Sequence, residues 1–465
     1  MQDSSSIHLR PLGAGLRSHR REGQRKARQL FPKFSTVLDR VGLAAILLTP
    51  ILLMHARSAA EGTIGLTVAC FLTRSAMAKD WAWVRSGWVP LGLGWWAWLV
   101  VCSLPLPALG LGEGGVPSLI QAFAALRFLL FAAAMHDWAL REGPARGWMY
   151  GVIAACASYI ALHVLVQFLT GYNLYGHGPG VAGELTGPFS GPRAGPPLAR
   201  ILLPVVIPPA ALLLARRRVA STAAAYALLL LSALLMVVIS QRMPAVLTAF
   251  GLVVSALLLP RLRPVVLASL VAGGALVAVS AVVSPPTWHR LVLQFSSQLE
   301  NFGGSHYGFI YERAAAMAEQ HPWTGRGFDG FRTGCLLPRY GERALEQAQI
   351  HFAVPKDEVC TPHPHNFYVQ AVTDAGFPGL LLFSGLALTW LVTLGRGLWR
   401  DPEPLGVGLF ASALIQLWPI ASTSGFFSMP MAGWSFLLLG WGLAESAGRR
   451  GSRAGAGAAA VIALS

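Results

Sequence analysis

The chain is dominated by apolar runs, each long enough to cross a lipid bilayer, that are separated by connections carrying arginine. A helix needs about 20 mostly apolar residues to span roughly 30 Å of hydrocarbon. We predict twelve such spans, which start near Val37, Ala59, Trp88, Val116, Gly147, Gly195, Val219, Met243, Pro264, Gly376, Leu405 and Phe427. The second span is the weakest, because Glu61 and Arg74 lie within it.

The composition supports a polytopic membrane protein. Hydrophobic residues make up 54% of the 465 residues and charged residues only 12%, whereas about a quarter of the residues of a soluble domain are charged. These values exclude an ordinary water-soluble enzyme, a disordered chain and a disulfide-dense secreted chain. The predicted fold class is therefore all-α, with about twelve transmembrane helices.

The net charge of +15 is explained by membrane topology rather than by a nucleic-acid partner, which we do not expect. Nine Lys and Arg residues lie in residues 1–40, and most of the others lie in alternate connections between the spans. The positive-inside rule places these connections and both termini in the cytoplasm, where they contact anionic membrane lipids.

This topology divides the chain into five parts. We predict a basic, disordered cytoplasmic tail over residues 1–36, spans one to nine over 37–284, a periplasmic loop over 285–365, spans ten to twelve over 366–447, and a second cytoplasmic tail over 448–465. The segment 285–365, here called the long loop, and the segment 171–194, the short loop, then face outward. A connection as long as the long loop is usually functional, and its composition predicts a helix over Tyr307–Glu319.

Two features of the long loop have simple interpretations. Gly325–Gly330 matches the pattern G-x-G-x-x-G, but no strand precedes it, so we predict a tight turn and no cofactor. Cys335 and Cys360 both lie in what is an oxidising compartment if the membrane is a bacterial inner membrane, and we predict a disulfide between them. It would close a loop of about 25 residues, worth roughly 3 kcal/mol.

The most distinctive stretch follows Cys360 and reads Thr-Pro-His-Pro-His-Asn-Phe-Tyr. A helix is expected to begin at Asn366, which places His365 at a positive helix end that disfavours imidazolium and keeps the ring able to accept a proton. One alternative is a histidine that only caps or packs. Another is a metal site of Cys360, His363 and His365, which is weak because three adjacent ligands lack a distant fourth. We expect no metal.

Three arginines lie in or beside the predicted spans. Arg200 lies ~7 Å inside span six at 1.5 Å per residue, Arg242 lies at the junction of spans seven and eight, and Arg127 lies near the middle of span four. A charge at mid-membrane costs about 3 kcal/mol, and the spans have almost no deep carboxylate. The arginines therefore indicate an anion outside the chain, with phosphate the natural candidate. The alternative for Arg242 is a side chain that extends to the membrane surface. The lack of acids argues against an ion-coupled transporter.

These residues resemble the motifs of the O-antigen ligase and O-antigen polymerase superfamily. The ligase motif is His-Asn, nine residues, and Gly-x-x-Gly, and here it is His365-Asn366 followed by Gly376–Gly379. Further matches are Leu185–Phe189 before Leu198-Ala-Arg200, Ile239-Ser-Gln-Arg242, and His321–Gly325 before Phe331-Arg332. The resemblance covers about residues 37–443. The stretch Gly191–Pro197 departs from the family pattern, which leaves the register between Arg193 and Arg200 open.

The resemblance implies a GT-C-like glycosyltransferase of the bacterial inner membrane that needs no metal or other cofactor. Such enzymes transfer a glycan from undecaprenyl diphosphate, with inversion, to an acceptor at the periplasmic face. For a ligase the acceptor is a hydroxyl of lipid A–core, and for a polymerase it is another lipid-linked unit. His365 would be the general base, and Arg200 and Arg242 would hold the diphosphate. Further candidates for contact with substrate are Arg127, Arg193, His363, Asn366, Arg313 and Arg332.

The ligase is the leading hypothesis and the polymerase is the first alternative. An exporter of polysaccharide or lipid-linked sugar is a third hypothesis. It predicts a continuous polar pathway through the spans and no requirement for His365, and the scarcity of acids in the spans counts against it.

Overall fold

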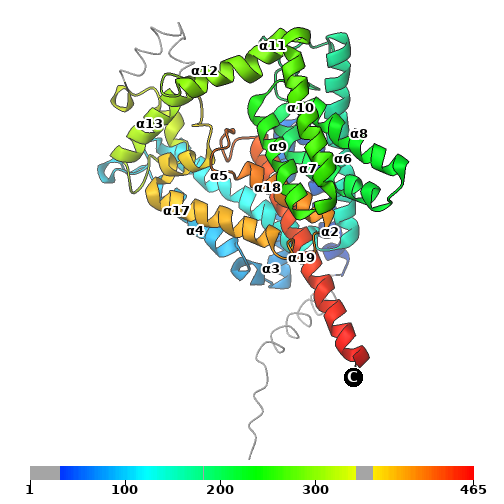
Figure 1. The fold of residues 1–465 in the computed structure, drawn as a ribbon. Coiled ribbons are helices and arrows are strands. Elements are labelled where there is room, and N and C mark those ends of the chain that lie inside the picture. Colours follow the sequence, from blue (N-terminus) through cyan, green and yellow to red (C-terminus); the bar gives the residue numbers. More distant parts are fainter. Residues whose placement is uncertain (1–31, 182, 342–359, 465) are drawn as a thin grey trace, which may run out of the picture.

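A computed structural model describes residues 32–181, 183–341 and 360–464 (Figure 1). Within these ranges the regular structure is entirely helical. A helix occupies each of the twelve predicted segments: α2 (Pro32–His55), α3 (Arg57–Ala78), α4 (Val89–Cys102), α5 (Gly115–Ala134), α6 (Gly143–Thr170), α7 (Gly195–Ala215), α8 (Val219–Val238), α9 (Arg242–Leu258), α10 (Arg263–Val283), α17 (Phe367–Gly395), α18 (Pro404–Gln416) and α19 (Met431–Leu464).

Seven helical segments in the described ranges are long and apolar enough to cross a membrane. They are Thr36–His55, Gly115–Ala139, Gly143–Thr170, Gly195–Ala215, Val219–Val238, Pro260–Val283 and Phe367–Gly395. Helices α4, α9 and α18 are apolar but shorter. The prediction of an all-helical polytopic membrane protein is therefore confirmed, whereas the number of twelve spans stays a prediction.

The helices pack around α7, which contacts α6, α8, α9, α18 and α19. Helix α17 lies beside α4, and α2 forms a hairpin with α3 (Figure 1). Large aromatic side chains fill the interior, and the fully buried ones include Trp88, Trp390, Trp434 and Trp441. Close packing of this kind fixes the helix ends, which is where the polar side chains of the candidate site lie.

The two predicted tails are only partly described. Helix α2 begins at Pro32, inside the predicted tail of residues 1–36, and residues 1–31 lie outside the described ranges. Helix α19 continues to Leu464, across the segment 448–465 that we predicted as a tail, and it extends away from the other helices (Figure 1).

The long loop is partly helical and lies at the opposite end of the molecule from the C-terminus (Figure 1). It contains α11 (Pro285–Trp288), η5 (His289–Leu293), α12 (Gln294–Glu300), α13 (His306–Gln320), α14 (Gly330–Gly334) and η6 (Pro338–Tyr340). Helix α13 confirms the helix predicted there, and the Ser305 hydroxyl caps it by accepting from Gly308 N. A disulfide joins Cys335 and Cys360, with their Cα atoms 5.7 Å apart.

The segment Gly325–Gly330 forms a turn that docks against a break in α17. The break is at Ala375 and Gly376, whose backbone dihedrals are not helical. Two backbone hydrogen bonds join the turn to α17, Arg326 N to Thr373 O at 2.8 Å and Gly327 N to Asp374 O at 3.0 Å, and a third runs from Phe377 N to Pro322 O, just before the turn, at 2.7 Å. The turn thus satisfies backbone groups that the break frees from the helix.

Gly376→Ala is expected to lower the stability of this junction by about 2 kcal/mol or more. Gly376 has φ +65°, which an alanine adopts only with strain, and a Cβ there would lie 2.4 Å from the carbonyl carbon of Trp323. The apparent Tm of the purified protein, taken at one scan rate, measures this effect. The matched control is Gly94→Ala in α4, where a Cβ meets nothing within 4 Å. An unchanged Tm for Gly376→Ala would contradict the account.

Candidate active site

A cavity of about 1240 Å³ lies where the long and short loops meet the ends of α7, α9, α17 and α18. Most of its surface is apolar, contributed by residues such as Phe250, Phe295 and Trp418. Its polar and charged side chains come from segments that are far apart in the sequence: Glu184, Arg200, Gln241, Arg242, Arg290, Gln298, Ser305, Tyr307, Tyr311, His365, Asn366, Gln416, Ser422, Thr423 and Ser424. An apolar pocket with a few convergent polar groups is typical of a ligand site.

His365 lies at the entrance to α17 and is fixed by its backbone. Its φ is +53°, and its carbonyl accepts a 2.8 Å hydrogen bond from Thr423 N. The neighbouring Asn366 caps α17 by accepting from Tyr368 N and Val369 N, and its amide donates to Pro419 O at 2.7 Å. Asn366 lines the cavity, and its side chain joins the start of α17 to the segment that follows α18. The helix start predicted at Asn366 is confirmed.

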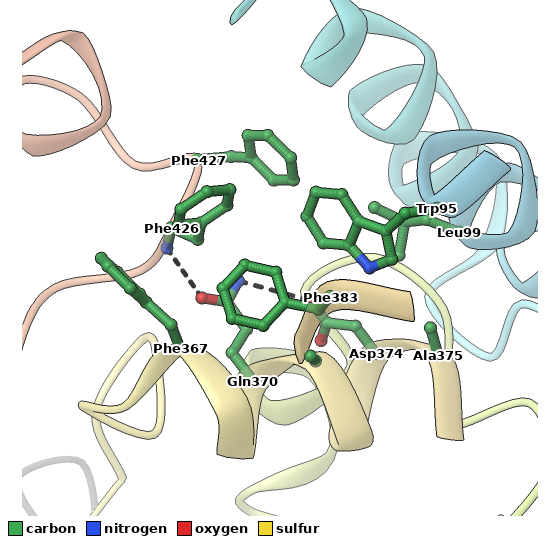
Figure 2. Close-up of a pocket in the computed structure, with 10 residues that line it drawn as sticks. Trp95, Leu99, Phe367, Gln370, Asp374, Ala375, Phe383, Phe426 and Phe427 are labelled. Carbon is green, nitrogen blue, oxygen red and sulfur yellow. Dashed lines mark hydrogen bonds between the residues drawn. The ribbon is translucent and has the colours of Figure 1, made fainter. Parts of the chain in front are cut away.

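One turn further along α17, a second polar chain holds the same segments together (Figure 2). Gln370 accepts from Phe426 N at 2.8 Å and donates to Asp374 at 3.3 Å, among the rings of Trp95, Phe383 and neighbouring aromatic residues. Asp374 in turn accepts from Gly330 N at 2.9 Å. The long loop, α17 and the segment after α18 are therefore linked by buried hydrogen bonds one turn along the helix from Asn366.

The His365 ring is neutral in this environment. Burial, reinforced by the nearby His306, lowers its pKa to about 4. His363, whose ring centroid lies 4.5 Å from that of His365, has its pKa lowered to about 4 by burial and by His365 and Arg332. The Tyr307 ring packs edge-on against the His365 ring, with the two ring centroids 5.6 Å apart. A neutral imidazole that faces a cavity is able to accept a proton from a ligand.

Arg200 lies on α7 and is only 7% exposed. Its guanidinium donates to three neutral acceptors, Pro196 O at 2.9 Å, Gln416 Oε1 at 3.2 Å and Thr423 Oγ1 at 2.9 Å. No ion pair of Arg200 is present among the described residues. Thr423 contacts both Arg200, through its hydroxyl, and His365, through its backbone N–H. The Arg200 guanidinium and the His365 backbone are therefore tied to the same residue of the cavity lining.

Arg242 is the first residue of α9, and its Nη1 donates to Gln298 Oε1 of α12 at 2.7 Å. Arg290 also lines the cavity and forms an ion pair with Glu184 of the short loop. Among the described residues that line the cavity, Glu184 is the single carboxylate, against three arginines. The site therefore has an excess of positive charge that favours an anionic ligand.

The structure brings together four of the predicted site residues, Arg200, Arg242, His365 and Asn366, and leaves the others outside the cavity lining. Arg193 is exposed next to Pro192, which does line the cavity. Arg313 is buried and donates to the carbonyls of Cys335 and Gly341. Arg332 is on the surface and pairs with Asp329.

The interpretation of Arg127 as an arginine without a carboxylate partner is wrong. Its guanidinium binds Glu61 with two hydrogen bonds, Nε to Oε2 at 2.8 Å and Nη2 to Oε1 at 2.9 Å. Helix α3 packs against α5, which brings Glu61 to Arg127 although 66 residues separate them. A paired arginine outside the cavity lining gives no indication of an external anion.

Several polar lining residues were not predicted as site residues, and five of them matter most for the site: Arg290, Gln298, Tyr307, Gln416 and Thr423. Four of them are uncharged, and none belongs to the motifs quoted above. Arg290 could have been considered a candidate from the sequence, because it is a basic residue at the start of the long loop and Glu184 is an acidic residue in the short loop. Their pairing depends on the tertiary fold.

Together, the helices and the cavity define a polytopic membrane protein with a positively charged site beside a neutral histidine. Residues 227–384 match the family model described as O-antigen ligase, which confirms the resemblance to that superfamily. The matched segment runs from α8 into α17 and contains Arg242, Arg290 and His365, whereas Arg200 and Thr423 lie outside it. The match supports a ligase- or polymerase-type function with a lipid-linked glycan. No curated protein matches the chain.

Proposed function

We propose that the chain is a glycosyltransferase that moves a glycan from undecaprenyl diphosphate to a hydroxyl of lipid A–core. In this proposal it lies in a bacterial inner membrane with both termini in the cytoplasm, and the cavity faces the periplasm. The observation that carries the proposal is the convergence of His365, Arg200 and Arg242 on one largely apolar cavity. A lipid diphosphate has the matching chemistry, since it combines an anionic group with an apolar chain.

The proposed reaction is a single displacement. His365 accepts the proton of the acceptor hydroxyl as its oxygen forms a bond with the anomeric carbon of the donor sugar. The bond between that carbon and the phosphate oxygen breaks, and undecaprenyl diphosphate leaves with the electron pair. Arg200 and Arg242 stabilise the charge that develops on the leaving group. Attack opposite the leaving group inverts the anomeric carbon.

In this proposal the guanidinium groups of Arg200 and Arg242 bind the diphosphate and stabilise its charge, so transfer needs no metal ion. Arg200 donates to neutral acceptors and Arg242 to an amide oxygen, so neither loses a carboxylate contact when phosphate binds. A fixed guanidinium also needs little reorganisation during the reaction.

Polymerisation is the second candidate function, because the same cavity and family match serve a polymerase equally well. The ligase is preferred for its His365-Asn366, nine residues, Gly376–Gly379 motif. An exporter has less support, since the polar groups described above gather in a cavity at one end of the helices.

Purified protein incubated with an undecaprenyl-diphosphate-linked glycan and lipid A–core, in the presence of EDTA, tests the proposal. Glycan on lipid A–core is the expected product. Longer glycans on the lipid carrier would instead identify the polymerase. Loss of product in EDTA that returns with a divalent cation would contradict the metal-independent mechanism, and absence of either product would contradict the glycosyltransferase.

The pH dependence of transfer is expected to reflect the neutral state of His365. Its pKa is lowered from roughly 6.5 for a free imidazole to about 4 in the ligand-free site, so the active, neutral form persists into acid. Because kcat/KM reports the free enzyme, kcat/KM should be level from about pH 8 to about pH 5 and fall below it. The bound diphosphate favours imidazolium, so the acidic limb of kcat should lie at higher pH. A fall in kcat/KM with its midpoint near pH 6.5 would contradict this account.

A further inference from the structure

The ion pair between Arg290 and Glu184 stands apart from the other ion pairs because it lies in the cavity wall. Arg290 belongs to η5 at the start of the long loop, and Glu184 belongs to the short loop. The Glu184 side chain is 8% exposed and that of Arg290 is 24% exposed. The pair is therefore close to the ligand space and largely shielded from water.

Arg290 keeps unused capacity for hydrogen bonding. Its Nη1 contacts Glu184, whereas its Nε is buried and has no hydrogen-bond partner among the described residues. A guanidinium has five N–H donors, and a buried donor without a partner costs roughly 1–3 kcal/mol. Because Nε itself is shielded from solvent, a ligand oxygen would relieve that cost only when the Arg290 side chain turns toward the ligand and its contact with Glu184 weakens.

The charges of the cavity support the same conclusion. Three arginines and one glutamate are the charged residues among the described lining, so two positive charges lack a carboxylate. Arg290 is also close enough to Arg242 for the two guanidinium groups to repel each other. A diphosphate diester carries one negative charge on each phosphate, so it would balance both excess charges and remove the repulsion.

We propose that Arg290 is a third phosphate-binding residue, and that Glu184 competes with the ligand diphosphate for its guanidinium. This inference rests on the proposed function for the identity of the ligand. In the empty site Glu184 holds Arg290 in place. When a diphosphate binds, its oxygens take over donors of Arg290, and part of the binding energy is spent on weakening the contact with Glu184.

Competition predicts opposite effects for the two partners of one ion pair. Arg290→Ala removes a charged donor and should weaken the binding of undecaprenyl diphosphate about tenfold. Glu184→Gln keeps the shape of the side chain but removes the competing charge, so it should tighten binding about threefold or more. The double variant should behave like Arg290→Ala alone, because Glu184 acts through Arg290.

The experiment measures the Kd of the full-length protein, in detergent micelles, for undecaprenyl diphosphate and for undecaprenol. Trp418 lines the cavity and provides a fluorescence signal. Undecaprenol lacks the phosphates, so its Kd should be the same for all variants. The matched controls are Arg146→Ala and Glu445→Gln, which break a 2.8 Å ion pair that lies outside the cavity lining; both should bind undecaprenyl diphosphate as the wild type does.

Each outcome decides the inference. Weaker binding by Arg290→Ala with tighter binding by Glu184→Gln supports it. Equal weakening by both variants would show that the pair only joins the two loops, and unchanged Kd values would show that Arg290 does not touch the ligand; either result overturns the inference. Wild-type binding without any glycan transfer would count against the proposed function alone. Failure of the wild type to bind undecaprenyl diphosphate would overturn both.

Discussion

His365→Ala is expected to lower the rate of glycan transfer by about a thousandfold while the Kd for undecaprenyl diphosphate changes less than about twofold. General bases typically contribute 10²–10⁴-fold to a rate. The neutral ring of His365 has no charge to offer a phosphate, so its removal should spare binding. The helix start should also survive, because Asn366 supplies the cap and the His365 backbone supplies the contact with Thr423.

Initial rates of transfer and Kd values for the same preparations measure this separation. His55→Ala is the matched control, since it removes an exposed imidazole that binds the Tyr159 hydroxyl and lies outside the cavity lining. A His365→Ala variant that keeps more than a tenth of the wild-type rate would contradict the role of general base. Equal loss of binding and rate would instead assign His365 to donor binding.

The sequence was sufficient to predict where the helices lie, because lipid requires long apolar runs and all backbone groups must be paired within them. It also predicted the start of α17, since Asn366 is a good N-cap that follows a proline-rich stretch. The break at Gly376 was not predicted. A glycine inside an apolar run is compatible with a continuous span, and only the docking of Gly325–Gly330 explains the break.

The candidate site was only partly predictable, for reasons that depend on distance along the chain. His365 and Arg242 belong to short local motifs, so pattern alone identified them. Thr423 has an ordinary sequence context, and its importance follows from contacts with two residues that are far away in sequence. The interpretation of Arg127 was wrong for a related reason. Its charge is paired with Glu61, which is distant in the sequence and whose proximity the sequence does not reveal. A charge can be assigned to a ligand only when its tertiary partners are known.

Arg200→Ala and Arg242→Ala are both expected to lower kcat/KM by about 10²–10³-fold, the usual effect of removing a group that stabilises developing charge, but through different steps. Among the described residues Arg242 has one hydrogen bond, to Gln298, so its loss should raise KM as well as lower kcat, and Arg242→Lys should restore part of the activity. Arg200 has three fixed acceptors and a shared contact with Thr423. Its loss should therefore act mainly on kcat, and Arg200→Lys should not restore it.

Separate kcat and KM values for the donor measure this difference. The matched control is Arg127→Ala, which removes an intramembrane arginine whose charge is already paired with Glu61 outside the cavity lining. It should lower the apparent Tm, because Glu61 is left without its partner, yet leave kcat/KM of the folded protein within about threefold of wild type. If Arg127→Ala instead lost as much activity as Arg242→Ala, the anion would not be held in the cavity of Arg200 and Arg242. The comparison of Arg242→Ala with Arg127→Ala therefore separates the effect of lost charge in the cavity from the effect of removing any arginine within the membrane.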